Sequence, residues 1–203
     1  RRRLLPGFTG EEAFNFVMMT LVSTSDPGLL ILPVHRLLRG LAPETLAGLQ
    51  EKLKAIFEIE KFRLLAADIP RLEAPLETLK TRGGVGIAIG LYGLEPDTFL
   101  LLSRHQAIPV ELMPPHTSPA YRGLEVTILR HLVLEEMLGI GEDKLAYTPH
   151  ATEALGRVAS GEYQLAFFLN PLGVGRLQAV ADAGTWFEQE IPGLRDWSFG
   201  EPE

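Results

Sequence analysis

The alternation of apolar and polar residues predicts short strands joined by turns at the start of the chain. Phe14–Ser23 and Leu29–Leu38 are dense in apolar and β-compatible residues. Asp26-Pro27-Gly28 lies between them and favours a turn, because proline presets φ, glycine accepts positive φ and aspartate bonds to the nearby backbone. The two runs are therefore predicted to form a hairpin. Pro33 cannot donate a hydrogen bond to a neighbouring strand, so an edge position or a bulge is expected there.

Between residues 43 and 103 the pattern predicts two helices, an exposed strand and a second hairpin. The helix from Pro43 to Ala55 has proline in its first turn and leucines along one face. Apolar and charged residues then alternate over Ile56–Leu65, which is typical of an exposed strand, with a slip near its end. The other predicted elements are a helix at Leu72–Thr81 that Gly83-Gly84 end, and strands at Val85–Tyr92 and Thr98–Ser103.

Strands and helices alternate in the second half of the chain. Ala107–Arg122 contains four prolines and reads as a linker. Leu124–Leu138 carries an apolar stripe at helical spacing and is followed by Gly139, which predicts a helix that ends there. After it come a predicted strand at Lys144–Thr148, helix at Thr152–Ser160, strand at Tyr163–Leu169 and helix at Val174–Ala183.

These elements predict a mixed α/β (α+β) fold, with antiparallel hairpins in the first half and alternating strand–helix units in the second. The predicted organisation is a hairpin-rich lobe at 1–106, a proline-rich linker at 107–122, a strand–helix lobe at 123–184 and a tail at 185–203. The chain opens on Arg1-Arg2-Arg3 without an initiator methionine. We therefore expect it to be a segment of a longer protein.

Composition narrows the classes of protein that fit. A hydrophobic content of 46% with 22% charged residues is that of a globular protein. The net charge of −7 argues against a nucleic-acid partner, because phosphate contacts need a basic face. No apolar run approaches the roughly 20 residues that span a bilayer, so no membrane association is expected.

The absence of cysteine changes the candidate chemistry. It excludes disulfides, thiolate metal sites and cysteine nucleophiles, and it fits a cytoplasmic location. Asparagine occurs at only two positions. Scarce asparagine and absent cysteine fit either a heat-adapted source or the codon bias of a GC-rich genome.

His35-Arg36 is the principal candidate site, because it ends an apolar run. A histidine beside a guanidinium at a strand end suits a general base or a phosphate contact. The alternative is that one side chain faces inward and the other outward, with His35 satisfied by the backbone. In a site, both should point into one concavity together with Asp26 or another carboxylate. Adjacent strand residues normally face opposite sides, so this convergence needs a bulge, which Pro33 could impose.

Gly173 and Gly175 are the candidate cofactor-binding residues. They lie between a predicted strand and a predicted helix, where backbone N–H groups can hold a phosphate. An ordinary strand-to-helix turn is the alternative, since the third glycine of the dinucleotide-binding pattern is absent. No metal site is predicted. His131 and Glu135 have helical spacing, which favours a solvated pair over a ligand pair.

Three segments resemble a large prokaryotic family, domain of unknown function 1015. They are FNFVMMTLVSTSDPGLLILPVHRLL, AYRGLEVTILRHLVLEEMLGI and SGEYQLAFFLNPLGVGRLQAVADAG. The resemblance covers most of residues 8–184 and corresponds to the C-terminal half of the family domain. In the family, an Asp-Gly-His-His-Arg-Tyr motif lies upstream, similar to that of the ParB and sulfiredoxin-like fold, which includes free-serine kinases. The resemblance implies a cytoplasmic protein that handles nucleotide or phosphate.

Two departures from the family pattern bear on that expectation. The upstream histidine motif is missing from this chain. A lysine-containing motif usually follows the last predicted helix, whereas Thr185–Glu190 here is acidic and would repel phosphate.

The sequence thus supports two functions. One is a small-molecule phosphotransferase or nucleotide-using enzyme, with ATP or ADP and Mg²⁺ as the expected ligands. The other is a non-catalytic binding or regulatory module that forms a homodimer through the apolar Leu124–Leu138 helix or through Trp186 and Trp197 of the tail.

Overall fold

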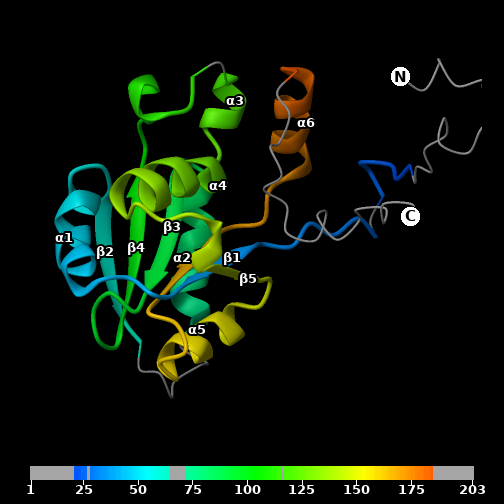
Figure 1. Cartoon of the computed structure of the whole chain (residues 1–203). Helices are drawn as coiled ribbons and strands as arrows, with labels where there is room; N and C mark the ends of the chain where they lie inside the picture. The colour runs from blue at the N-terminus through cyan, green and yellow to red at the C-terminus, as the bar shows by residue number, and fades with distance from the viewer. Residues whose placement is uncertain (1–20, 27, 65–71, 116, 185–203) are drawn as a thin grey trace, which may run out of the picture. The chain divides into compact units, whose positions relative to one another are not determined.

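The computed structural model describes residues 21–26, 28–64, 72–115 and 117–184. The chain divides into two compact units, Arg1–Leu30 and Ile31–Glu203. The second unit contains every helix and strand described below (Figure 1).

The second unit is built on a six-stranded sheet in the order β2-β4-β3-β6-β1-β5, in which every neighbouring pair is antiparallel. The strands are β1 (His35–Leu38), β2 (Glu58–Arg63), β3 (Ile87–Tyr92), β4 (Thr98–Arg104), β5 (Leu145–Thr148) and β6 (Leu165–Phe168). Because β3 pairs with β6, strands from both sides of the proline-rich segment 107–122 lie in one sheet. The predicted mixed α/β fold is confirmed.

Six α-helices accompany the sheet in the described residues. They are α1 (Pro43–Lys54), α2 (Glu73–Gly83), α3 (Pro119–Arg122), α4 (Glu125–Ile128), α5 (Ala151–Ala159) and α6 (Val174–Asp182). A π-helical segment, η5 (Leu129–Met137), continues α4, and short 3₁₀ turns lie at Val110–Leu112 and Glu142–Lys144. Among the described residues, no helix combines the length and the apolar character that crossing a bilayer requires.

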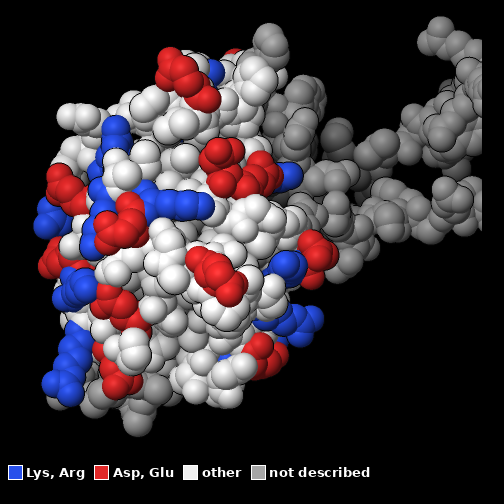
Figure 2. All heavy atoms as spheres, turned by 60° about the vertical axis from the view of Figure 1, so that its left-hand side comes forward, with Lys and Arg blue, Asp and Glu red and all other residues white. Residues whose placement is uncertain are grey.

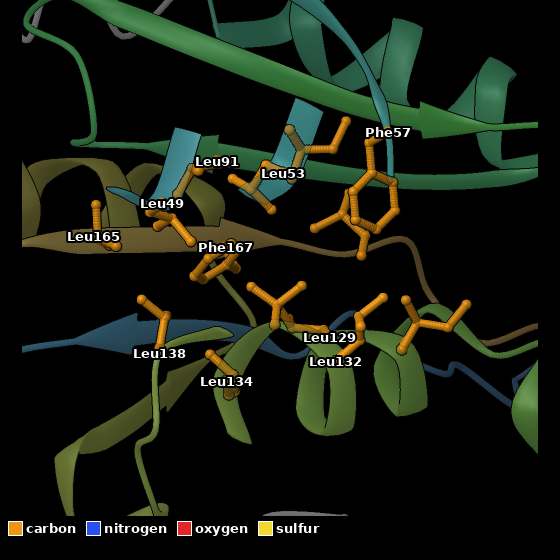
Figure 3. Packing of buried hydrophobic residues seen from close by; sticks show 14 of the residues in the cluster. Leu49, Leu53, Phe57, Leu91, Leu129, Leu132, Leu134, Leu138, Leu165 and Phe167 are labelled. Atoms are coloured by element: carbon orange, nitrogen blue, oxygen red, sulfur yellow. The ribbon is translucent and has the colours of Figure 1, made fainter. Parts of the chain in front are cut away.

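Helices cover both faces of the sheet, and each face has its own apolar core. Leucines of α1 and η5 pack on one face, where they converge with Phe167 of β6 (Figure 3). Leu79 of α2 and Leu155 of α5 pack on the other face. Fully burying one such side chain stabilises the fold by about 1.5–3 kcal/mol, so both faces contribute.

The two covered faces explain the slip predicted in Ile56–Leu65. β2 pairs with β4 without interruption, from Glu58 opposite Ser103 to Arg63 opposite Thr98. Ile59 packs against the first core, and Phe62 packs against the second. The alternation of apolar and charged residues breaks because the apolar residues of this regular edge strand face first one core and then the other.

The predicted hairpin between Phe14–Ser23 and Leu29–Leu38 is wrong. β1 begins only at His35, and its two edges are occupied by β5 and β6. Residues 14–20 lie outside the described residues, and residues 21–23 are not in a strand. The turn itself is confirmed, since Leu29 N donates to Asp26 O at 3.0 Å and Gly28 N donates to Asp26 Oδ1 at 2.7 Å.

The helix predicted at Leu124–Leu138 is confirmed with an unexpected second half. Leu138 N donates to Val133 O, five residues earlier, at 3.0 Å, which is the bond of a π-helix. Gly139 follows with φ of +63° and ends the helix as predicted. The other predicted elements from residue 43 to residue 184 form within a few residues of their expected bounds.

Charged side chains of both signs are interspersed on the face shown in Figure 2. Ion pairs occur at the molecular surface, such as Lys61 Nζ with Glu95 Oε1 at 2.6 Å and Lys54 Nζ with Glu51 Oε1 at 2.7 Å. Exposed pairs of this kind contribute about 0–1 kcal/mol each, so the two buried cores carry most of the stability.

Candidate functional site

A cavity of about 1070 Å³ opens in the second unit beside the ends of three neighbouring strands of the sheet. β5 and β6 end beside the cavity and β1 begins there, because β5 and β6 are both antiparallel to β1. The remaining walls come from α2, from the first residues of α4 and α5, and from α6. Its lining thus combines segments that are far apart in the sequence.

His35 lines this cavity from the start of β1. Its imidazole is 3% exposed, and its ring centroid lies 5.2 Å from that of Phe168. Leu169 N donates to Nδ1 at 3.3 Å. Burial, with the nearby His150 as a smaller cause, lowers the pKa of His35 to about 4.

The imidazole of His35 is therefore neutral at pH 7, and its tautomer follows from the bond at Nδ1. Since Nδ1 accepts a hydrogen bond, the proton of the neutral ring lies on Nε2. The side chain then offers an N–H donor rather than a basic lone pair. This favours the phosphate-contact interpretation of His35 over the general-base interpretation.

Glu125 and Arg176 form a second polar group in the cavity wall. Arg176 Nη1 donates to Glu125 Oε2 at 2.6 Å, and Nη2 donates to Gly123 O at 2.7 Å. Glu125 is only 6% exposed, although it opens α4 next to two apolar residues. Burial raises the pKa of its carboxyl, and the Arg176 guanidinium opposes that rise.

Asn170 joins the cavity wall to the end of α2. Its Nδ2 donates to Leu79 O at 3.0 Å, in the C-terminal half of the helix. Gly83 makes room for this amide, because a Cβ at residue 83 would overlap Asn170 Nδ2. Gly83-Gly84 therefore end the helix as predicted and also shape the cavity.

Arg36, the predicted partner of His35, lies elsewhere. The backbone from His35 to Leu38 is a regular strand paired on both edges, so adjacent side chains face opposite sides of the sheet. Arg36 is 3% exposed, donates to Val126 O at 3.4 Å, and lines a small separate hollow with Tyr147. Pro33 precedes the strand and introduces no bulge. The structure therefore does not bring His35 and Arg36 into one concavity.

The other predicted residues are placed as follows. Asp26 belongs to the first compact unit, where its carboxylate accepts from Gly28 N within the turn. Gly173 is the N-cap of α6 and Gly175 lies in its first turn. A Cβ at either glycine would meet nothing within 4 Å, so neither position requires glycine for packing. The α6 side chain that lines the cavity is Arg176.

The sequence interpretation missed Glu125, Asn170 and Arg176. Asn170-Pro171 directly after a strand was a usable indication, since strand ends commonly carry functional side chains. A glutamate between Leu124 and Val126 was another, because a carboxylate is seldom placed within an apolar stretch.

The predicted pair of His131 and Glu135 forms, with Nδ1 and Oε2 2.8 Å apart. Across the described ranges, no three His, Cys, Asp or Glu side chains cluster as metal ligands would.

Comparison with known proteins gives one match. The sequence model of a protein family of unknown function, DUF1015, matches residues 1–127 of the 203. Residues 128–184, to which the resemblance was predicted to extend, lie outside this match, and the assignment to the C-terminal half of the family domain stays a prediction. No curated protein and no solved structure matches the chain.

Proposed function

Because the chain belongs to the DUF1015 family, whose function is unknown, we propose that it is a small-molecule phosphotransferase or another nucleotide-using enzyme whose ligand occupies the cavity at His35. The observation that carries this proposal is the neutral, buried imidazole that lines a cavity and has its Nδ1 engaged by Leu169 N.

A neutral imidazole N–H suits a phosphate oxygen. It donates a hydrogen bond without the cost of burying a cation, and a bond to a charged acceptor contributes about 1.5–3 kcal/mol. The cavity volume, about 1070 Å³, lies just above the range of about 300–1,000 Å³ found for small-molecule sites, which leaves room for a nucleotide.

The charges of the lining bear on the form of the nucleotide. Lys80 and Arg176 are cationic, whereas Glu73 and Glu77 of α2 and Glu125 of α4 are acidic. A lining of mixed sign favours ATP or ADP bound with Mg²⁺ over the free polyanion, because the metal offsets part of the phosphate charge. The expected cytoplasmic location is consistent with such a ligand.

Isothermal titration calorimetry with ATP and ADP in the presence of Mg²⁺ tests this proposal. We expect saturable binding to the 203-residue chain, and a loss of affinity of roughly tenfold or more in His35→Phe, which keeps an aromatic ring beside Phe168 but offers no N–H. His105→Gln, at an exposed histidine, is the matched control and should bind like wild type. Equal binding by His35→Phe and wild type, or no binding of either nucleotide, contradicts the proposal.

The alternative is a non-catalytic binding or regulatory module that dimerises. The apolar Leu124–Leu138 helix favours this module less than its sequence suggests. Ile128, Leu132 and other residues of its stripe are packed in the core and are not free for an interface. Trp186 and Trp197, the residues of the tail that also favour this module, lie outside the described residues. Light scattering at high protein concentration separates the two functions, since a strict monomer that binds nucleotide argues against the dimeric module.

A further inference from the structure

The start of α5 carries backbone N–H groups that lack partners within the helix. Ala154 N donates to His150 O at 3.0 Å, which is the first hydrogen bond of the helix. The N–H groups of residues 151–153 therefore have no acceptor in α5. Among the described side chains none caps this end, and Thr148 Oγ1 accepts from His150 N at 3.2 Å instead. Ala151, the first residue of α5, lines the large cavity.

His35 lines the cavity from the strand beside this helix start. It lies opposite Thr148 in the pairing of β1 with β5, and α5 begins at Ala151, shortly after that strand ends. Its side chain is on the face that α5 covers, because Leu37, the next residue but one in β1, packs in one core with Leu155 of α5. The imidazole and the start of α5 therefore line neighbouring parts of the cavity.

The imidazole of His35 directs one polar atom at this space. The residue is 3% exposed, and Nδ1 accepts from Leu169 N. Nε2 has no partner among the described residues, yet it is not one of their fully buried unpartnered atoms, so it is open to the cavity. Burial lowers the pKa of His35 to about 4, and His150 at the start of α5 adds to that effect. An almost wholly buried side chain thus presents a neutral N–H donor to a ligand.

The starts of the other helices at the cavity suit an anion less well. α2 and α4 begin with Glu73 and Glu125, and both of these acidic residues line the cavity and would repel an anion. At α6, the side chain of Arg176 lines the cavity, whereas Gly173 and Gly175 are not among the lining residues. α5 therefore offers the most suitable helix start.

The first turn of α5 contains one acidic residue, Glu153, whose carboxylate is already bonded. It accepts from Thr148 Oγ1 and pairs with Arg157 Nη1 at 3.5 Å. Glu153 is not among the residues that line the cavity. An anion in the cavity therefore meets N–H donors and the positive end of the helix dipole at this point.

We propose that the backbone N–H groups at the start of α5 and Nε2 of His35 together bind the terminal phosphate group of a nucleotide or of another phosphorylated small molecule. The inference rests on the proposed function and places its phosphate at α5 rather than at Gly173 and Gly175 of α6. Backbone and imidazole N–H groups donate to a phosphate dianion without burying a cation. Inorganic phosphate is the smallest molecule that contains this group, and it is therefore the probe.

Ala151→Pro tests the proposal because it removes one N–H group and keeps the helix start. Proline is favoured at the first position of a helix. His150, which precedes it, is extended with φ of −102° and ψ of 111°, as suits the residue before a proline. The matched control is Val174→Pro, which removes the equivalent N–H group of α6 and follows an extended Gly173. Both variants should melt close to the wild-type temperature.

Two-dimensional ¹⁵N NMR titration of the 203-residue chain with inorganic phosphate at constant ionic strength measures the binding. In wild type and in Val174→Pro, we expect saturable shifts of the backbone amides of Thr152 and Glu153. The amide of Leu169 should shift with them, because it is bonded to His35. In Ala151→Pro the affinity should fall roughly tenfold, since a hydrogen bond to a charged acceptor is lost.

Three results overturn the inference. The first is equal phosphate affinity in Ala151→Pro and wild type. The second is a loss of affinity in Val174→Pro as large as that in Ala151→Pro. The third is the absence of saturable shifts at the start of α5 in wild type, which needs no variant to be observed.

ADP with Mg²⁺, titrated into the same proteins, separates this inference from the proposed function. If ADP binds wild type and Ala151→Pro equally, the phosphate is not held at α5, although the nucleotide-using function stands. If inorganic phosphate binds as expected and ADP does not bind, the nucleotide-using function fails. The phosphate site then stands and serves another phosphorylated small molecule.

Discussion

At the scale of single residues, the burial of His35 couples its protonation to folding. Its pKa is about 4 in the folded chain and about 6.5 when the chain is unfolded. The unfolded state therefore binds more protons between these two values, and stability falls as pH decreases through that window. The full stability is present above pH 6.5, and roughly 3 kcal/mol is lost by pH 4 from this group.

Urea denaturation at a series of pH values between 7 and 4 measures this loss. His35→Asn keeps an acceptor for Leu169 N at the position of Nδ1 and cannot titrate, so its stability should decline with pH less steeply than that of wild type. The exposed His105→Gln should follow the wild-type curve. Parallel curves for wild type and His35→Asn would show that His35 is not held in its neutral form by burial.

The candidate site shows what one sequence can predict about individual residues. His35 was found because a histidine at the end of an apolar run is unusual, and the structure places it in the cavity. Arg36 was grouped with it on the assumption of a bulge, and the regular pairing of β1 separates the two. Glu125 and Arg176 are 51 residues apart, and no local pattern could show that they meet.

At the scale of elements, Gly90 in β3 is required by the packing between strands. A Cβ at this position would lie 2.9 Å from Phe168 Cβ and closer still to the ring of Phe99. Phe168 in turn packs on His35, so the fit of β3 against β6 also sets the wall of the site.

Gly90→Ala and Gly48→Ala form a matched pair that tests this packing. We expect Gly90→Ala to lower the free energy of unfolding by about 1–3 kcal/mol, because the core must shift to admit the methyl group. Gly48 lies within α1 with nothing within 4 Å of an added Cβ, so Gly48→Ala should raise it by roughly 0.5–1 kcal/mol. Chemical denaturation measures the free energy of unfolding of both variants. Similar changes in the two would contradict the packing described for Gly90.

The elements that were predicted well are those whose cause is local. α1 begins at a proline, the helical segment of α4 and η5 ends at Gly139, and β3 and β4 are joined by a short turn. β1 was predicted too long, because residues 29–34 are apolar without being in the sheet. Its true partners, β5 and β6, lie more than a hundred residues further along the chain, which no periodicity reveals.

At the scale of the whole molecule, the cavity results from sheet order. β1 is placed between β6 and β5, which brings the ends of those two strands beside His35. α2 and the starts of α4, α5 and α6 complete the walls. Since strand order is a property of the complete sheet, the cavity could not be derived from any one segment of the sequence.

The proposed function requires that His35 bind the phosphate of a nucleotide in this cavity. A crystal structure of the 203-residue chain grown with ADP and Mg²⁺ tests it most directly. We expect ADP in the cavity with a phosphate oxygen within hydrogen-bonding distance of His35 Nε2. ADP bound at another surface, or a cavity without nucleotide in crystals grown at saturating ADP, would contradict it.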